Sequence, residues 1–383
     1  MQSLIQRGRS FLTPTGSSAN VKNAGSFSTA KSEDALFPRT DPAVDGEECL
    51  HDCSECTVHY PAKFSIDEDD KLFGQVKGWD THLVVGTGKT DWVRDVTDEK
   101  GSVMEAVGKY GQEIQMSSGR GQGKVMLSAS NMPASSEHDH DEGSDCMLLP
   151  SWTFIENVKP EQVPDLMQNI VANSVSNRTP LDGLKVEPHQ SDVHSSTDTP
   201  NGASTPLEMG PSHTNGSQHT EPVDVAALTI NPPLAASQFS TRPIPHRALI
   251  LMCSHKTRDA RCGQSAPLLR KEFERILRPM GLHRDLHDSR PGGVGIYFIN
   301  HVGGHKYSAN VMIYRRAGSK AISSSEPKEE EIKDEAVQGI WLARVRPEDC
   351  ENIVRYTVLQ GKLVKPKSQL RGGFDREKGL ASW

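Results

Sequence analysis

A motif of strand, proline turn and helix occurs twice in this chain of 383 residues, and it constrains the fold more than any other feature. Val158-Lys159-Pro160-Glu161 in the first half matches Val345-Arg346-Pro347-Glu348 in the second. The apolar positions that follow keep the same offset and have helical spacing. Proline suits the first turn of a helix, where its missing N–H costs no hydrogen bond. We therefore predict two tandem α/β domains of one ancestry.

A second, weaker sequence match indicates that each copy of the motif is preceded by an earlier strand of the same domain. His82–Thr87 resembles Ala248–Cys253, and each reads as a buried strand that runs into a loop. Thr87 then stands where the second copy has Cys253. Cys350 stands where the first copy has Val163, so we interpret Cys350 as a core residue and not as a ligand.

The stretch between the two copies cannot form a packed core. From Val186 to Thr241 there are six acids and no Lys or Arg. No Phe, Trp or Tyr occurs between Phe154 and Phe239. Such a segment buries too little apolar area to offset its ordering entropy. We predict a disordered linker over 181–241 between domains at 45–180 and 242–383. Insertions at about 117–145 and 317–337 have a similar composition. The His-Asp run over 137–142 is interpreted as a solvated loop, with weak metal binding as the alternative.

The N-terminus predicts mitochondrial import. Residues 1–32 contain Arg and Lys, abundant Ser and Thr, and no acid, which is typical of a transit peptide. We assign 1–40 to a transit peptide or disordered leader. The net charge of −7 argues against a nucleic-acid binder. No apolar run approaches the roughly 18–20 residues that span a bilayer, so we predict no membrane span. Seven cysteines favour thiol, metal or cluster chemistry over a disulfide scaffold.

The C-terminal domain has the element order β-α-β-β-β-α. Its expected strands are 247–252, 295–300, 310–315 and 340–345, and its first helix covers about 265–278. We expect a hairpin between the second and third strands. This order suits a thioredoxin-like layered domain.

Two pairs of residues in this domain indicate a metal or redox site. Cys253 and Cys262 flank the first loop as C-x8-C, and His301 and His305 flank a Val-Gly-Gly turn as H-x3-H. Structural zinc sites usually have a shorter C-x2–4-C spacing. A [2Fe–2S] cluster tolerates longer gaps and accepts imidazole as well as thiolate. Zinc, a cluster, a redox-active thiol pair and simple packing all remain open on spacing alone.

Histidine ligation would have a functional consequence. Two ferric ions, two sulfides, two thiolates and two neutral imidazoles sum to zero charge, whereas four thiolates leave −2. A neutral cluster accepts an electron more readily, so its reduction potential is higher. Each imidazole keeps one N–H, which couples electron transfer to protonation.

These motifs, together with the terminal Trp383, resemble the sucrase/ferredoxin-like family. The resemblance covers about 45–180 and 242–383. It implies a thioredoxin-like ferredoxin in the C-terminal domain, a [2Fe–2S] cofactor, and Cys253, Cys262, His301 and His305 as ligands. The N-terminal domain lacks these residues and is expected to be degenerate and free of a cluster. The family resemblance also implies single-electron transfer in mitochondria, with thiol redox quality control as the expected process. The expected partners are a redox donor, a redox acceptor and the iron–sulfur assembly machinery.

Several alternatives accompany this interpretation. The rival class is an enzyme, a thioredoxin-type thiol oxidoreductase that uses Cys253 and Cys262 directly; a zinc-stabilised interaction module is a third option. Cys49, Cys53 and Cys56 form either a second thiol site or a set of reduced thiols. The alternative histidine ligands are His255, His283 and His287. A group of basic residues forms either a docking surface for an acidic redox partner or a solvated helix face: Lys256, Arg258, Arg261, Arg270, Lys271, Arg275 and Arg278.

Overall fold

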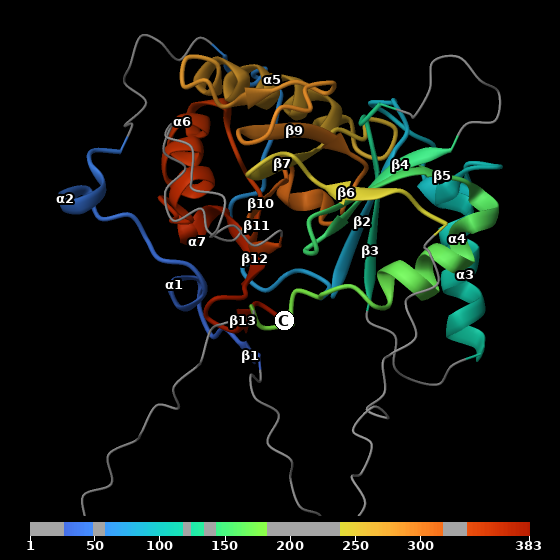
Figure 1. The fold of residues 1–383 in the computed structure, drawn as a ribbon. Coiled ribbons are helices and arrows are strands. Elements are labelled where there is room, and N and C mark those ends of the chain that lie inside the picture. The colour runs from blue at the N-terminus through green and yellow to red at the C-terminus, as the bar shows by residue number, and fades with distance from the viewer. Residues whose placement is uncertain (1–26, 49–57, 118–123, 134–142, 182–237, 317–334) are drawn as a thin grey trace, which may run out of the picture.

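The computed structural model describes residues 27–48, 58–117, 124–133, 143–181, 238–316 and 335–383 (Figure 1). Within these ranges thirteen strands form one continuous sheet, so the chain is a mixed α/β protein. Most of the predicted linker and insertions lie outside the described residues. So do residues 1–26 of the predicted leader, the run over 137–142, and Cys49, Cys53 and Cys56.

The N-terminal half contributes strands in the order β3-β2-β4-β5. β2 and β3 run parallel and are connected through helix α3, whereas β4 and β5 each pair antiparallel to their neighbour. The short strand β6, from the chain after residue 237, extends this half beyond β5. The bounds are β2 Thr81–Gly86, α3 Val103–Ser117, β3 Val125–Ser130, β4 Ser144–Leu149, β5 Thr153–Val158, α4 Val163–Asp165 and β6 Thr241–Pro243.

The C-terminal half repeats this order as β9-β7-β10-β11 and adds β12 beyond β11. From β7 to α6 its element order agrees with the predicted β-α-β-β-β-α, apart from the two-residue strand β8 (His283–Arg284), but a short helix and two further strands follow that the prediction lacked. The predicted hairpin is wrong, because β7 lies between β9 and β10 and pairs with both. The bounds are β7 Ala248–Cys253, α5 Ala260–Leu277, β9 Val294–Ile299, β10 Val311–Arg316, β11 Ala336–Leu342, α6 Cys350–Asn352 and β12 Leu370–Asp375.

The two halves meet at β3 and β9, which pair antiparallel. Asn131 and Asn300 each follow one of these strands directly. The side chain of Asn131 accepts the N–H of Phe298 at 2.7 Å, and that of Asn300 accepts the N–H of Ala129 at 3.0 Å. This reciprocal pattern gives the junction a local two-fold symmetry.

Both faces of the sheet are buried, which explains why its strands read as nearly continuous apolar runs. Helices α5 and α6 cover one face of the C-terminal half, and α3 and α4 cover one face of the N-terminal half (Figure 1). The other faces of the two halves share a core that includes Trp152 and Trp341. The halves therefore belong to one folded body, joined by a shared sheet and core.

The repeated motif has the same local geometry in both copies. The side chain of Gln162 accepts the N–H of Lys159 at 2.9 Å, and that of Asp349 accepts the N–H of Arg346 at 2.8 Å. Such reciprocal capping satisfies a backbone N–H at the helix start. Each helix then passes into a π-helical turn, Leu166–Val171 in one copy and Ile353–Val358 in the other, which keeps the offset of the sequence repeat.

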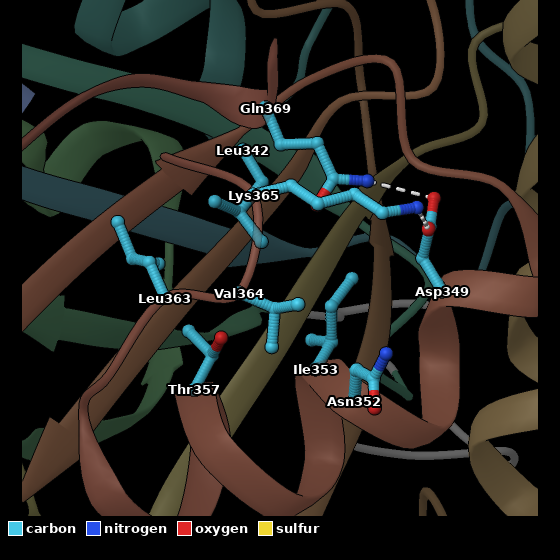
Figure 2. Close-up of a pocket in the computed structure, with 9 residues that line it drawn as sticks. All are labelled: Leu342, Asp349, Asn352, Ile353, Thr357, Leu363, Val364, Lys365 and Gln369. Atoms are coloured by element: carbon cyan, nitrogen blue, oxygen red, sulfur yellow. Dashed lines mark hydrogen bonds and ion pairs between the residues drawn. The ribbon is translucent and has the colours of Figure 1, made fainter. Parts of the chain in front are cut away.

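Asp349 also anchors the segment that leads into β12. Its carboxylate accepts hydrogen bonds from Lys365 Nζ and Gln369 Nε2, both at 2.7 Å, beside a cavity of about 10 Å³ (Figure 2). That volume holds at most about one water molecule. Lys365 precedes helix α7 (Pro366–Gln369), Gln369 is its last residue, and β12 follows directly. Asp349 therefore fixes where β12 begins.

The segments near both chain ends pack together. β1 (Ser28–Thr29) pairs parallel with β13 (Leu380–Ala381), and Trp383 stacks on Trp79 with ring centroids 4.2 Å apart. Leu36 and Phe37, in and after helix α1 (Glu33–Leu36), are fully buried, and helix α2 (Pro42–Asp45) follows. The residues from 28 onwards in the predicted leader are therefore part of the folded body.

Candidate metal centre

Cys253 and Cys262 lie at the end of β7 and in the first turn of α5. Asp259 caps this helix, because its carboxylate accepts the N–H of Arg261 at 3.0 Å. The free N–H groups of a helix start carry partial positive charge, which stabilises a nearby thiolate. Both cysteines are only 1% exposed, so the fold shields their sulfur atoms from solvent.

His301 reaches the same place by a crossover. It lies just beyond β9, which runs parallel to β7, so the ends of the two strands lie side by side. The loop to β10 must pass over the end of β7, since β10 pairs with the other edge of β7. Its Nδ1 lies 3.6 Å from Cys253 Sγ and 3.7 Å from Cys262 Sγ. All three donor atoms lie within 4.8 Å of one another, which makes this a group able to hold a metal.

His305 lies on the same loop and begins the short 3-10 helix His305–Tyr307. Its side chain lies outside the part of the chain that the structure describes, so its role as a ligand stays a prediction. Gly303 and Gly304 form the turn between the two histidines with φ angles of 86° and 74°. Glycine adopts such angles without steric cost. A Cβ on Gly304 would also lie 2.5 Å from the guanidinium of Arg371.

The two thiols differ in acidity. Burial raises the pKa of Cys253, but hydrogen bonds with Cys262 and His301 outweigh burial and lower this pKa to about 5. The hydrogen bond to Cys253 and burial raise the pKa of Cys262. The hydrogen bond between them therefore favours ionisation of Cys253 before Cys262, and ionisation of both thiols requires a nearby positive group. A bound metal supplies such a charge.

Protein-family comparison gives the chain a match over residues 72–372, to the family described as sucrase/ferredoxin-like. The chain belongs to the sucrase/ferredoxin-like family. The matched range includes both halves and all four predicted ligands.

Named relatives agree with this assignment. The chain is 26% identical over 330 residues to actin patches distal protein 1 of Saccharomyces cerevisiae, covering 84% of this chain and 83% of that one. It is 35% identical over 127 residues to altered inheritance of mitochondria protein 32 of Clavispora lusitaniae, covering 33% of this chain and 36% of the relative. The namesake in Meyerozyma guilliermondii is 32% identical over 119 residues, 31% of this chain and 33% of the relative. These last two matches thus span about a third of each relative's length. No solved structure matches the chain.

In this sucrase/ferredoxin-like chain, a loop of the N-terminal half holds the cysteine loop, residues 253–262. The carboxylate of Asp91 accepts the N–H of Thr257 at 3.0 Å and its hydroxyl at 2.8 Å. The carbonyl of Thr90 accepts the hydroxyl of Ser254 at 2.8 Å. Residues 87–94 follow β2 as the cysteine loop follows β7, so the half that lacks the ligand motif supports the half that has it.

His255 connects three segments of the site. Its Nδ1 accepts the N–H of His301 at 3.3 Å, and its Nε2 donates to the carbonyl of Trp92 at 3.0 Å. Both ring nitrogens are thus engaged, which makes His255 a support and not the alternative ligand we considered. The other two alternatives lie apart from the described group of donors. His283 lies 3.8 Å from Glu274 on α5, and His287 is exposed.

Arg371 is a site residue that sequence reasoning missed. It is 5% exposed and donates to the carbonyl of Gln75 at 3.0 Å, the carbonyl of Gly303 at 2.9 Å and the amide oxygen of Asn310 at 3.0 Å. Its guanidinium also lies 4.4 Å from the ring centre of Trp341. Burial lowers the pKa of Arg371 to about 10, so the group remains charged at neutral pH. The one available signal was an arginine inside the buried strand 370–375.

The arginines of α5 are largely paired along the helix. Arg270 and Arg278 contact Glu274, and Arg275 contacts Glu272. Pairs with this spacing are common on solvated helix surfaces. They favour a solvated face over the predicted docking surface. None of the helices described is long and apolar enough to cross a membrane.

Proposed function

We propose that this protein is a [2Fe–2S] electron carrier whose ligands are Cys253, Cys262, His301 and His305. The observation that carries the proposal is that two thiols and one imidazole lie within 4.8 Å of one another. The loop that supplies His301 also contains His305. Thiolate and imidazole are the donor types found in mixed-ligand clusters. When bound, such a cluster takes up and releases one electron.

The residues of the site have different roles in shielding, access and support. Cys253 and Cys262 are 1% exposed, so the cysteine side excludes water. His301 is half-buried and lies on the outer loop. Electrons therefore enter at the histidine side, although Nε2 of His301 is itself buried. The loop at residues 87–94 holds the cysteine loop in place through Asp91.

Burial argues against the rival thiol oxidoreductase. In such an enzyme a thiolate attacks the disulfide of its substrate and forms a mixed disulfide. The low pKa of Cys253 suits that chemistry, but its sulfur is inaccessible to a protein disulfide in this conformation. A zinc-stabilised module uses the same donor types, so metal analysis must separate it from the cluster.

The test is the colour and metal content of the purified full chain, handled without oxygen. We expect visible absorption with iron and acid-labile sulfide in equal amounts, and loss of all three in Cys253→Ser. Cys350→Ala is the matched control, because Cys350 is a fully buried cysteine of the core and should leave the colour intact. A colourless protein that contains zinc, or no metal, would refute the proposal.

We also propose that the protein is mitochondrial. The composition of residues 1–26 is that of a transit peptide, and several relatives are named altered inheritance of mitochondria protein 32. Because residues from 28 onwards pack in the fold, the leader to test is 1–26. A reporter fused to residues 1–26 should enter mitochondria, and the chain without them should stay in the cytosol. Import of the shortened chain would contradict this.

We further infer that both halves are thioredoxin-like units of one ancestry. The inference is supported by their shared strand order, the reciprocal hydrogen bonds of Asn131 and Asn300, and the repeated capping and π-helical turns. A role in thiol redox quality control, with assembly machinery and redox proteins as partners, stays a prediction from the resemblance.

A further inference from the structure

Arg371 carries a buried charge for which the described residues offer no matching carboxylate contact. Its three hydrogen-bond acceptors are two backbone carbonyls and one amide oxygen, all of them neutral. Its other contacts are the ring faces of Trp341 at 4.4 Å and Tyr307 at 5.3 Å. Burial of an uncompensated ion is costly, and proteins usually pair such a charge. Among the residues that the structure describes, the contacts of Arg371 therefore leave its charge without a carboxylate partner.

Negative charge can arise close to Arg371 at the candidate metal centre, where the Cys253 thiolate interacts with it. Arg371 donates to Gly303, which lies between His301 and His305, and its guanidinium lies against Gly304. Its strand, β12, pairs with β11 and follows the anchor at Asp349, and Arg371 lies at an irregularity of that pairing, where its own hydrogen bonds hold it. Arg371 is therefore fixed beside the loop of the proposed ligands.

We propose that Arg371 is the built-in counter-charge of this centre: it favours uptake of the electron and so raises the reduction potential. The inference rests on the proposed function. A one-electron donor supplies the electron, which adds one negative charge at the centre. A fixed positive charge in a region of low dielectric constant stabilises that added charge. The guanidinium remains protonated throughout and transfers no proton.

Arg344 provides a matched comparison. It is also buried, at 6% exposure, and it lies 5.5 Å from the same Tyr307 ring. Its guanidinium donates to the carbonyl of Asp70 and interacts with the Asp70 carboxylate, so its charge has a partner. Arg344 thus shares the burial and the aromatic contact of Arg371 but not its contact with Gly303.

The experiment measures the midpoint potential of the loaded full chain by a dye-mediated redox titration, followed by visible absorption. Arg371→Gln removes the charge, and Arg371→Lys keeps it while losing the planar fork of hydrogen bonds. At a fixed solution potential, we expect Arg371→Gln to lower the ratio of reduced to oxidised protein about tenfold. For one electron this corresponds to a midpoint potential lower by about 59 mV. Arg371→Lys and Arg344→Gln should stay close to wild type.

Two results would overturn the inference. Either Arg371→Gln keeps the wild-type potential, or Arg371→Lys shifts it as far as Arg371→Gln does, in which case charge is not the cause. Asn310→Asp covers the case in which the Arg371 variants do not fold. Its carboxylate can keep the hydrogen bonds from Arg371 and Trp341 while cancelling the positive charge. A lowered potential there supports the inference, and an unchanged one contradicts it. A colourless wild-type protein would instead refute the proposed function.

Discussion

The support that the N-terminal half gives to the cysteine loop predicts that Asp91→Ala loosens residues 253–262 specifically. The substitution removes both hydrogen bonds from Thr257 to the carboxylate. A hydrogen bond to a charged group contributes about 1.5–3 kcal/mol when buried, and solvent screening at half-buried Asp91 reduces this to about 1 kcal/mol each. The loop should then open about 2 kcal/mol more easily, which is a factor of about 30.

The assay is amide hydrogen exchange resolved by peptide, which works with or without a bound metal. Peptides covering 253–262 should exchange about 30-fold faster in Asp91→Ala by the same conversion. Asp95→Ala is the control, because Asp95 accepts the N–H and the hydroxyl of Thr97 at 3.1 and 2.8 Å within its own loop. It loses the same two types of hydrogen bond, neither of them made to the cysteine loop, with which Asp95 interacts only electrostatically through Arg258. Equal exchange of 253–262 in the two variants would refute the reasoning.

Further predictions concern the ligands, pH and the chain end. His301→Cys should keep a coloured cluster at lower potential, because a thiolate adds negative charge; an unchanged or raised potential in the titration would contradict this. The wild-type potential should fall as pH rises through the imidazole pKa of the oxidised protein, whereas a flat profile would indicate four thiolates or ligands that do not titrate. Burial raises the pKa of Asp91, but hydrogen bonds with Thr257 lower this pKa by more, so that it lies below its ordinary value of 3.8. The stability that Asp91 gives to the cysteine loop is therefore complete above the ordinary pKa and is lost as pH falls through the lower pKa of the folded protein. The exchange difference between wild type and Asp91→Asn should accordingly vanish at the acid end of that window; a difference that persists would count against it. Trp383→Ala should lower the free energy of unfolding in urea by about 2 kcal/mol, since it removes the stacking on Trp79, and an unchanged midpoint would contradict the packing.

The local elements of this fold could be read from the sequence, because periodicity and capping are local signals. The repeated motif predicted the helix starts at Pro160 and Pro347, and a helical turn begins at each of them. The burial of Cys350 in the core is also confirmed. Strand pairing was harder. A Gly-rich loop between two strands usually indicates a hairpin, but here β7, which precedes α5 in the chain, inserts between β9 and β10.

The site was predictable in its residue types and not in its supports. C-x8-C and H-x3-H stood out because cysteine and histidine are rare, and the structure brings Cys253, Cys262 and His301 together. Asp91 and Arg371 are ordinary residues far from the motif in sequence, and only tertiary contacts relate them to it. For the same reason, the sequence could not show that the N-terminal half supports the cysteine loop.

Mixed thiolate and imidazole ligation is the central claim, and electron paramagnetic resonance of the dithionite-reduced protein tests it most directly. With histidine labelled by ¹⁵N, the signal of the reduced protein should show hyperfine coupling to two nitrogen nuclei, and His301→Cys should leave one. A protein without a signal after reduction, or a signal without nitrogen coupling, would contradict the account.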